Sequence, residues 1–539
     1  MNHLYYGDNL HVLRESLAAE SVDLIYLDPP FNSKRDYNLL FKSPKGHSSE
    51  AQIEAFKDSW SWGSQAEKEL DELTKQSNTD VTQMMNALIA FLGRNDMTAY
   101  LVMMSTRLLE MHRVLKPTGS LYLHCDPVAS HYLKIVLDAV FGKLRFKTEI
   151  VWKRTTSHGN VGRAFGDCTD TIFLYTKSAE FVWNQLYEPM APEYIEDRFT
   201  GRDADGRRWQ SVTLRNPGPR PNLHYPFTAS NGITYEPHPN GWSCDLKRMK
   251  KYDAKKRLHF PKPGGQLRLK MYLDESPGIK LQNLWTDIPP INSQAQERLG
   301  YPTQKPLALL HRIIEVSSNP GGVVLDPFCG CGTAVHAAEK NKRKWIGIDI
   351  THLAISLIEK RLKDAFGKRC KFDVHGTPQD LESARDLAAR DKYQFQWWAV
   401  SLVEAQPFQG KKKGADTGID GLKFFRDLDK KEVRKIVVSV KGGGLKADDV
   451  RALNHVRDRE KAEIALFLSL EKPTAGMVKD AAAAGFYESA TGKKFARVQL
   501  LTIEALLSGT ARAEHPDYEP DLNFKKAKTE AHGEQTQLL

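Results

Sequence analysis

Apolar and polar positions alternate in a regular way over much of the first 367 residues, outside the stretches 34–95 and 178–282. Short apolar runs, suited to buried strands, are separated by segments whose leucines and isoleucines recur at helical spacing. The expected strands are residues 4–6, 22–27, 120–126, 149–152, 171–176, 323–326 and 345–349, and the expected helices are 10–17, 101–111, 131–141, 307–316, 334–339 and 351–366. Strands that alternate with helices predict an α/β fold with a doubly wound, Rossmann-like parallel sheet.

The strand expected at 22–27 ends abruptly in Asp28-Pro29-Pro30-Phe31, because two successive prolines cannot continue it. Ligands bind at this carboxyl end of strands in open α/β sheets. The motif suits methylation of an exocyclic amine. Asp28 and the Pro29 carbonyl can each accept a hydrogen bond from an NH2 group, which leaves the lone pair of the nitrogen free to react. Phe31 can stack on an extruded base. Taken alone, the four residues are equally well explained as a strand-ending turn.

A second strand end lies near residue 326. The run Val323–Asp326 leads into Pro327-Phe328-Cys329-Gly330-Cys331-Gly332-Thr333, and the strand after the next helix ends in Asp349. Glycines let a backbone approach a ligand closely, and the acid at the end of the following strand can bind ribose hydroxyls. No lysine follows the glycines as in a P-loop, so a nucleoside triphosphate is disfavoured.

The two strand ends together resemble the amino-methyltransferases of DNA that use S-adenosylmethionine, and the target motif comes first, as in the β group of that family. The resemblance covers residues 1 to about 367 and includes Thr303-Gln304-Lys305-Pro306, which matches a family segment beside the methionine part of the cofactor. It implies that Asp28, Pro29, Pro30 and Phe31 are catalytic. It implies that the cofactor is bound by Asp8, Thr303, Gln304, Lys305, Asp326, Pro327, Phe328, Gly330, Gly332, Thr333 and Asp349. Asp8 could also cap the helix that follows it.

The resemblance favours the N6 amine of adenine as the target, since the N4-cytosine enzymes of the family more often carry serine at the position of Asp28. N4-cytosine, RNA and protein glutamine stay open as alternatives, because a similar turn serves those substrates. A C5-cytosine enzyme is disfavoured, because it needs a cysteine nucleophile and neither Cys329 nor Cys331 follows a proline. The non-enzymatic alternative is a DNA-binding module with an inactive transferase core, and the intact motifs argue against it.

Charge points to the partner. Lysine and arginine exceed the acids by 77 to 67, a net charge of +10, which suits a polyanion. Residues 178–282 lose the rhythm of strands and helices and gather prolines, aromatics and basic clusters such as Lys247–Lys251. Basic groups can hold phosphates, and aromatics and amides can read bases. The β group carries its target-recognition region here, so we expect 178–282 to contact double-stranded DNA. A homodimer is left open.

The expected methyltransferase core comprises residues 1–177 and 283–367, with an insertion at about 34–95 that shows helical patches and no clear strand. The insertion could close on substrate or simply pack on the sheet. Six cysteines without C-x-x-C spacing argue against a disulfide framework or a zinc ribbon. The sequence shows no signal peptide and no apolar stretch long enough to span a membrane, so we expect a cytoplasmic protein with no membrane partner.

A second domain is expected at 393–511, after a polar connector at 368–392 and before a disordered tail at 512–539. A glycine-rich turn at 414–421 precedes a strand at 422–425, and further strands are expected at 435–441 and 462–469. An acid before one strand and a lysine at the end of the next resemble the restriction-endonuclease-like PD-(D/E)xK fold, a smaller α/β domain.

In that nuclease fold two acids hold Mg²⁺ and the lysine activates water or steadies the phosphate. The resemblance implies that Asp420 is the metal ligand, that Lys441 is the lysine and that Glu404 is an accessory ligand. Ser439 stands where a second acid or a glutamine is usual, and a hydroxyl binds Mg²⁺ more weakly. Three alternatives stay open: an active nuclease fused to its methyltransferase, a nuclease fold that only binds DNA, and a partner-binding α/β module.

Overall fold

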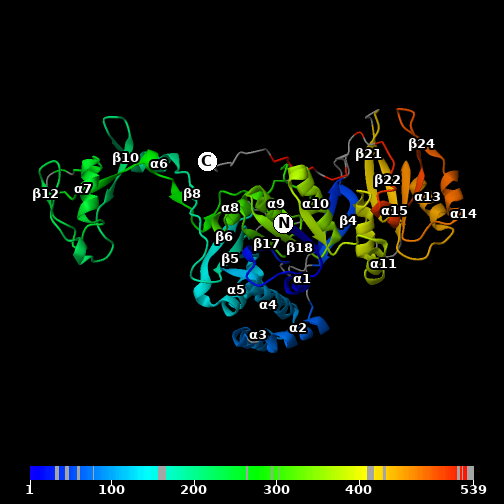
Figure 1. The fold of residues 1–539 in the computed structure, drawn as a ribbon, viewed down its shortest axis with the longest axis horizontal. Helices are drawn as coiled ribbons and strands as arrows, with labels where there is room; N and C mark the ends of the chain where they lie inside the picture. The colour runs from blue at the N-terminus through cyan, green and yellow to red at the C-terminus, as the bar shows by residue number, and fades with distance from the viewer. Residues whose placement is uncertain are drawn as a thin grey trace. The chain divides into compact units, whose positions relative to one another are not determined.

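The computed structural model contains a nine-stranded mixed sheet with the strand order β16-β6-β7-β5-β2-β17-β18-β1-β19 (Figure 1). In chain order these strands are β1 (Asn2–Tyr6), β2 (Val22–Leu27), β5 (Leu115–Cys125), β6 (Phe146–Lys153), β7 (Thr169–Thr176), β16 (Leu284–Trp285), β17 (Val323–Asp326), β18 (Lys344–Asp349) and β19 (Phe372–His375). The expected α/β class is confirmed. The sheet differs from the expected all-parallel one because β7 runs antiparallel to β5 and β6. β6 and β7 are consecutive, and antiparallel neighbours need no crossover helix.

The structure describes residues 1–30, 61–76, 78–155, 165–260, 262, 265–292, 295–301, 303–408, 418–428, 432–516, 518, 523–524 and 526–530, and the backbone alone of 36–42 and 48–57. Within these ranges no helix combines the length and the apolar composition that crossing a bilayer requires. All six cysteines lie in these ranges and are free thiols.

Helices cover both faces of the large sheet. Figure 1 shows α1 (Asn9–Ser16), α4 (Asp96–Val114) and α5 (Pro127–Phe141) on one side, and α8 (Leu307–Ser317), α9 (Thr333–Lys340) and α10 (His352–Phe366) on the other. Leu13, Ile25, Leu108, Leu121 and Val136 are fully buried in one cluster between the sheet and the first group of helices. Each such aliphatic side chain stabilises the fold by roughly 1.5–3 kcal/mol. This packing fixes the strands and hence the positions of their carboxyl ends.

The insertion at about 34–95 contains strands, so the expectation of no clear strand is wrong. β3 (Asp36–Lys42) and β4 (Ser48–Lys57) form an antiparallel pair, followed by the helices α2 (Ser64–Thr74) and α3 (Thr79–Leu92). The register of β3 and β4 shifts twice, between Tyr37 and Asn38 and between Leu40 and Lys42. Such irregularities break the alternation of apolar and polar positions by which a strand is recognised in a sequence.

The segment expected as a polar connector contributes to the main sheet. Its residues include β19, which pairs in parallel with β1 at the edge of the sheet, and α11 (Leu381–Arg390). Edge strands are short and often charged, which is why the sequence Phe372–His375 carries no apolar run.

A second sheet lies in the carboxy-terminal part, with the order β20-β21-β22-β23-β26. Its strands are β20 (Gln406–Pro407), β21 (Gly421–Arg426), β22 (Val433–Lys441), β23 (Ile464–Ser469) and β26 (Val498–Thr502). β22 is antiparallel to β21 and parallel to β23. The helix α12 (Lys392–Ser401) precedes the sheet, and α13 (Asp449–Arg459) connects β22 to β23. The strands expected at 422–425, 435–441 and 462–469 are therefore present, although residues 414–417 of the expected turn lie outside the described part.

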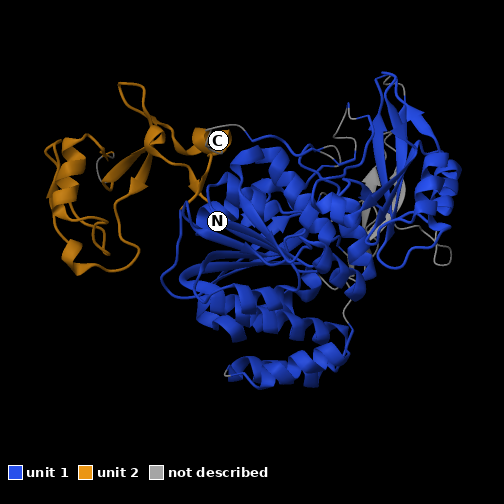
Figure 2. Cartoon of the chain, turned by 45° about the vertical axis from the view of Figure 1, so that its right-hand side comes forward, with its two compact units in different colours: residues 1–184, 283–534 blue, residues 185–282, 535–539 orange. Residues whose placement is uncertain are grey.

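The chain divides into two compact units, coloured separately in Figure 2. One consists of Met1–Asn184 and Asn283–Glu534, and the other includes Gln185–Gln282. The latter has its own sheet, in which β10 (Arg208–Thr213) pairs with β14 (Arg268–Tyr272), and a helix, α7 (Leu246–Ala254). Trp242, Met249 and Leu258 are buried in its separate core. The loss of rhythm after residue 178 thus reflects a small, mainly β unit with its own core.

The described residues of the terminal segment make specific contacts, so the expectation of disorder from residue 512 is wrong for them. The Asn523 side chain bonds both the amide and the carbonyl of Phe424 on β21. Glu530 bonds His336 at 3.1 Å and pairs with Lys340 at 2.9 Å, both on α9. Charged composition predicted solvation, whereas Glu530 meets complementary groups on the folded surface of α9.

Glu530 provides a stability prediction. Its pKa is lowered from 4.5 to about 2 by the hydrogen bond from His336 and by the charge of Lys340. A carboxyl with a lowered pKa stabilises the fold fully above its unfolded pKa, and the contribution is lost as the pH falls through the folded pKa. Glu530→Gln should therefore reduce the free energy of unfolding at pH 7 by on the order of 1 kcal/mol.

Denaturant titrations at several pH values test this expectation. The difference between the wild type and Glu530→Gln should be constant from pH 7 to about 5 and shrink below pH 4.5. Glu382→Gln, at an exposed position of α11, is the matched control and should behave as the wild type. Equal stability of Glu530→Gln and the wild type at pH 7 would contradict the assigned contacts.

Candidate active site

A cavity of about 1030 Å³ lies at the carboxyl ends of β1, β2, β17 and β18. This edge of the sheet is where the sequence placed its candidate residues. The residues from those expectations that line the cavity are Asp8, Asp28, Pro29, Pro30, Thr303, Gln304, Lys305, Asp326, Pro327, Phe328, Gly330, Thr333 and Asp349. Gly332 does not line it, and Phe31 lies outside the described residues. One cavity thus gathers residues that are as far apart in the sequence as Asp8 and Asp349.

Asp28 and Lys305 form an ion pair at the carboxyl end of β2. The Lys305 ammonium donates to Asp28 Oδ2 at 2.5 Å, and both side chains are largely buried. Asp28 Oδ1 is buried and has no hydrogen-bond partner among the described residues. A buried carboxylate oxygen without a donor is costly, and such groups are retained where a ligand supplies the donor. The ion pair therefore fixes one oxygen and leaves the other available to a ligand.

Gln304 and Thr303 support the turn before Lys305. Gln304 accepts from the Leu299 amide at 2.8 Å and donates to the Glu297 carbonyl at 2.5 Å, which ties the segment back on itself. Thr303 has a positive φ of 62°, in the left-handed region that costs a β-branched residue energy. The side chain of Gln304 is thus engaged within the protein, while Lys305 is aimed at Asp28.

The turn after β17 is held by acids. Asp326 is buried, and its Oδ1 accepts from the Phe328 amide at 3.1 Å. Burial, with Asp28 and Asp349 nearby, raises the pKa of Asp326 well above its ordinary value. Asp349 Oδ2 accepts from the Gly330 amide, and its Oδ1 accepts from the amide and hydroxyl of Thr351, all at 2.9 Å. Burial raises the pKa of Asp349 to about 6.

Glycine at 330 is required by both its backbone and its surroundings. Its φ is +50°, and a Cβ there would lie 3.1 Å from the ring of Tyr301. Burial raises the pKa of the thiols of Cys329 and Cys331, on either side of Gly330, which disfavours the thiolate form that a nucleophile needs.

A buried arginine that sequence reasoning missed organises the part of the cavity wall that contains Asp8. Arg107 on α4 bonds both carboxylate oxygens of Asp8 at 3.1 Å, donates to Asn9 Oδ1 at 2.7 Å and approaches Glu69 at 3.6 Å. Asp8 also caps α1 by accepting from the Leu10 amide. Asn9 in turn donates to the Pro327 carbonyl at 2.8 Å. The arginine lies inside an apolar helical stretch, and only its unusual place in that stretch could have indicated it.

The carboxy-terminal part also reaches this cavity. Tyr393, Gln394 and Trp397 on α12 line it. The Gln394 side chain accepts from the His352 amide at 3.3 Å, and the His352 ring stacks on Tyr6 at 3.6 Å between centroids. The sequence indicated a helix with buried aromatics here, but no local signal assigned them to a site in the first domain.

The residues expected for a nuclease site are only partly brought together. Asp420 Oδ2 accepts from the Val440 amide at 2.7 Å and from the Ser439 hydroxyl at 3.4 Å. Lys441 lies two residues after Ser439 on β22, and its ammonium pairs with the carboxylate of Asp449 at 3.3 Å. Glu404 is largely exposed and approaches Lys423 at 3.7 Å. Asp420 thus contacts Ser439 and Val440 on β22, the strand that also carries Lys441.

Comparisons with known proteins show the family to which this chain is similar. The family profile described as DNA methylase, of the N6/N4 type, matches residues 22–360. The type II methyltransferase M.EcaI of Enterobacter cloacae is 31% identical over 335 residues, which is 61% of this chain and 72% of that protein. The DNA adenine methyltransferase YhdJ of Escherichia coli is 24% identical over 359 residues, 67% of this chain and 82% of that protein.

Among solved structures, the M1.HpyAVI complex with S-adenosylmethionine is 15% identical in sequence, with a TM-score of 0.30. The superposition covers 67% of this chain and all of the M1.HpyAVI chain. The family profile spans both strand-end motifs and more than half of the chain. The protein therefore belongs to the N6/N4 DNA methylase family and is a DNA methyltransferase.

Proposed function

We propose that the protein moves a methyl group from S-adenosylmethionine to the N6 amine of adenine in duplex DNA, with Asp28 as the acceptor for the amine. The observation that carries this proposal is the buried Asp28 Oδ1, which has no partner among the described residues while Oδ2 is held by Lys305. Asp28 therefore presents a fixed, unsatisfied acceptor at the end of β2.

The cavity fits the cofactor in size and in donor set. Its volume of about 1030 Å³ is large enough for a nucleoside and an amino-acid side chain together. The carboxylates of Asp8 and Asp349 can accept from hydroxyls in addition to the contacts they already make, since each oxygen has two lone pairs. The close approach at Gly330 leaves backbone next to the ligand. When bound, S-adenosylmethionine supplies an activated methyl group on a sulfonium.

The protein's own residues act on the amine. Asp28 Oδ1 accepts one N–H and the Pro29 carbonyl accepts the other, so the nitrogen turns its lone pair toward the methyl group. Lys305 holds Asp28 in place through its hydrogen bond to Oδ2. Phe31 is proposed to stack on the extruded base, by resemblance alone. Adenine is favoured over N4-cytosine by the aspartate at position 28, and a relative named as an adenine methyltransferase supports that choice.

We propose that residues 1–177 and 283–367 form the catalytic core and that 178–282 recognise the target. The unit Gln185–Gln282 supports this assignment, because it has its own core and carries exposed Lys247, Arg248, Lys250 and Lys251 on α7. Basic side chains on an exposed helix can bind phosphates without disturbing the fold.

A nuclease function of residues 393–511 is a second candidate. The observations that favour it are the strand order, with β22 between an antiparallel β21 and a parallel β23, and the contact between Asp420 and the Ser439–Val440 segment. Asp420 would hold Mg²⁺ and Lys441 would steady the phosphate or activate water. Ser439 supplies only a hydroxyl, so a fold that binds DNA without cutting it is the alternative.

Asp28→Asn tests the catalytic proposal. The variant has nearly the same shape, but its single amide oxygen is held by the Lys305 ammonium, so the amide nitrogen, which can only donate, takes the place of Oδ1 and faces the amine. Transfer of labelled methyl groups to DNA should fall by at least two orders of magnitude, while calorimetry should show nearly unchanged cofactor affinity. The wild-type product should be N6-methyladenine in hydrolysed DNA. Wild-type turnover in Asp28→Asn would contradict the role of Asp28, and N4-methylcytosine would contradict the choice of base.

Asp349→Ala tests the cofactor site. Loss of an acceptor for buried hydroxyls should weaken cofactor binding by on the order of 1–3 kcal/mol. In the wild type, affinity should also fall as the pH drops below about 6, where the Asp349 carboxyl becomes protonated and loses acceptor strength. Calorimetry at pH 8, 7, 6 and 5 measures both effects. Unchanged affinity in a folded variant would refute the assignment.

Asp420→Asn and Lys441→Ala test the nuclease candidate. The asparagine can still accept from the Val440 amide, so the variant tests charge rather than fold. With Mg²⁺, both variants should lose DNA cleavage and keep methyl transfer, whereas Lys446→Ala, at an exposed lysine on the same loop, should keep both. Absence of cleavage by the wild type on methylated and unmethylated DNA, with several divalent metals, would leave only the DNA-binding and partner-binding alternatives.

A further inference from the structure

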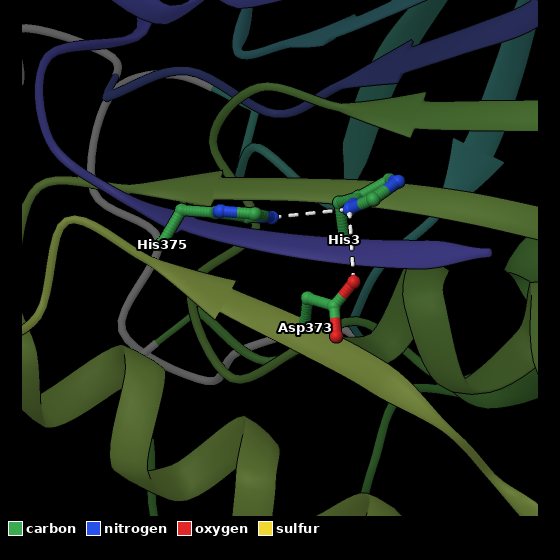
Figure 3. A group of neighbouring side chains, drawn as sticks. All are labelled: His3, Asp373 and His375. Carbon is green, nitrogen blue, oxygen red and sulfur yellow. Dashed lines mark hydrogen bonds and ion pairs between the residues drawn. The ribbon is translucent and has the colours of Figure 1, made fainter. Parts of the chain in front are cut away.

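Three side chains that commonly bind metals meet at the edge of the nine-stranded sheet. His3 lies on β1, and Asp373 and His375 lie on the edge strand β19. In the parallel register His3 is opposite Asp373, and Tyr5 is opposite His375. Side chains of alternate residues share a face of a sheet, so all four point to the same side. Figure 3 shows the two imidazoles turned toward each other, with the Asp373 carboxylate next to His3.

The separations suit a single small cation. His3 Nδ1 is 3.1 Å from His375 Nε2 and 3.9 Å from Asp373 Oδ2, and the three ligand atoms all lie within 4.8 Å of one another. Two nitrogens that share a zinc ion at about 2.0–2.1 Å lie roughly 2.8–3.4 Å apart for bond angles between a right angle and a tetrahedral one. The histidine pair already has this spacing, and rotation of the carboxylate closes the third distance.

The surroundings hold the ligands in place. The His375 ring stacks on Tyr5 with centroids 4.5 Å apart and planes at 19°. His3 and His375 belong to paired strands, so their backbones cannot move apart without breaking the sheet. The cluster is only partly buried, which gives an ion a route from solvent. None of its three residues lines the cavity at the carboxyl ends of the strands in the described structure, so the cluster is separate from the active site.

We propose that His3, Asp373 and His375 bind one divalent transition metal, with Zn²⁺ as the best-fitting ion. Two imidazoles and one carboxylate favour zinc and its neighbours over Mg²⁺ and Ca²⁺, which prefer oxygen ligands. Three protein ligands leave at least one position for water. The metal would fasten β19 to β1. The chain continues from β19 through α11 to α12, whose Tyr393 and Trp397 line the active-site cavity. In that position the metal would steady the segment that leads to α12.

Titration of metal-free full-length protein with ZnCl2 tests the proposal. Calorimetry should show one tight site in the wild type, and Zn²⁺ should raise the melting temperature. His3→Ala and His375→Ala should each weaken binding at least tenfold and abolish the thermal gain, and Asp373→Asn should weaken binding by a smaller factor. His131→Ala, at an exposed histidine of α5, is the matched control and should bind as the wild type does. An excess of Mg²⁺ should not displace the zinc.

Methyl transfer measured without zinc should be the same in all these variants, which verifies that they are folded. The proposal is overturned if the wild type shows no zinc site at micromolar concentration. It is equally overturned if His3→Ala and His375→Ala, both folded, keep wild-type affinity, because the zinc would then be held by other histidines.

Discussion

The parallel pairing of β2 with β17 is the constraint on which the active site depends. Leu24 lies opposite Val324 and Ile25 opposite Leu325, so the two strands end side by side at Asp28 and Asp326. Asp23 strengthens the pairing, since its Oδ2 accepts from the Val323 amide at 2.8 Å and from Lys116 of β5 at 2.7 Å. β5 lies on one side of β2, and β18 lies on the far side of β17, so the cavity opens where the order of strands reverses.

This arrangement concentrates carboxyl groups and therefore costs stability. Asp28, Asp326 and Asp349 share one partly buried cavity, and burial raises the pKa of the latter two. Lys305 offsets part of the repulsion by pairing with Asp28. In the proposed function a sulfonium cofactor would add a second positive charge, which would lower the cost of ionising these groups. Strained and like-charged groups of this kind are common where activity, not stability, sets the sequence.

Much of this site could be predicted from the sequence, because its parts are local. The end of a strand can be recognised in the sequence when two prolines or a run of glycines follow it, whatever the order of strands in the sheet. Long-range features could not be predicted. Arg107 binds Asp8 across about a hundred residues, and Trp397 comes from a helix beyond the core. Glu530 looked like part of a solvated tail because only the folded α9 presents His336 and Lys340 to it. The strands β3 and β19 escaped notice for a different reason, since neither has the regular apolar pattern of a buried strand.

The central claim is that Asp28 Oδ1 accepts a hydrogen bond from the amine to be methylated. The most direct measurement is a crystal structure of the protein with a non-reactive cofactor analogue and a duplex that carries the target site. We expect the exocyclic nitrogen of an extruded adenine within hydrogen-bond distance of Asp28 Oδ1 and of the Pro29 carbonyl, with Lys305 still paired to Oδ2. An extruded base whose amine lies away from Asp28, with the carboxylate engaged only by Lys305, would contradict the account.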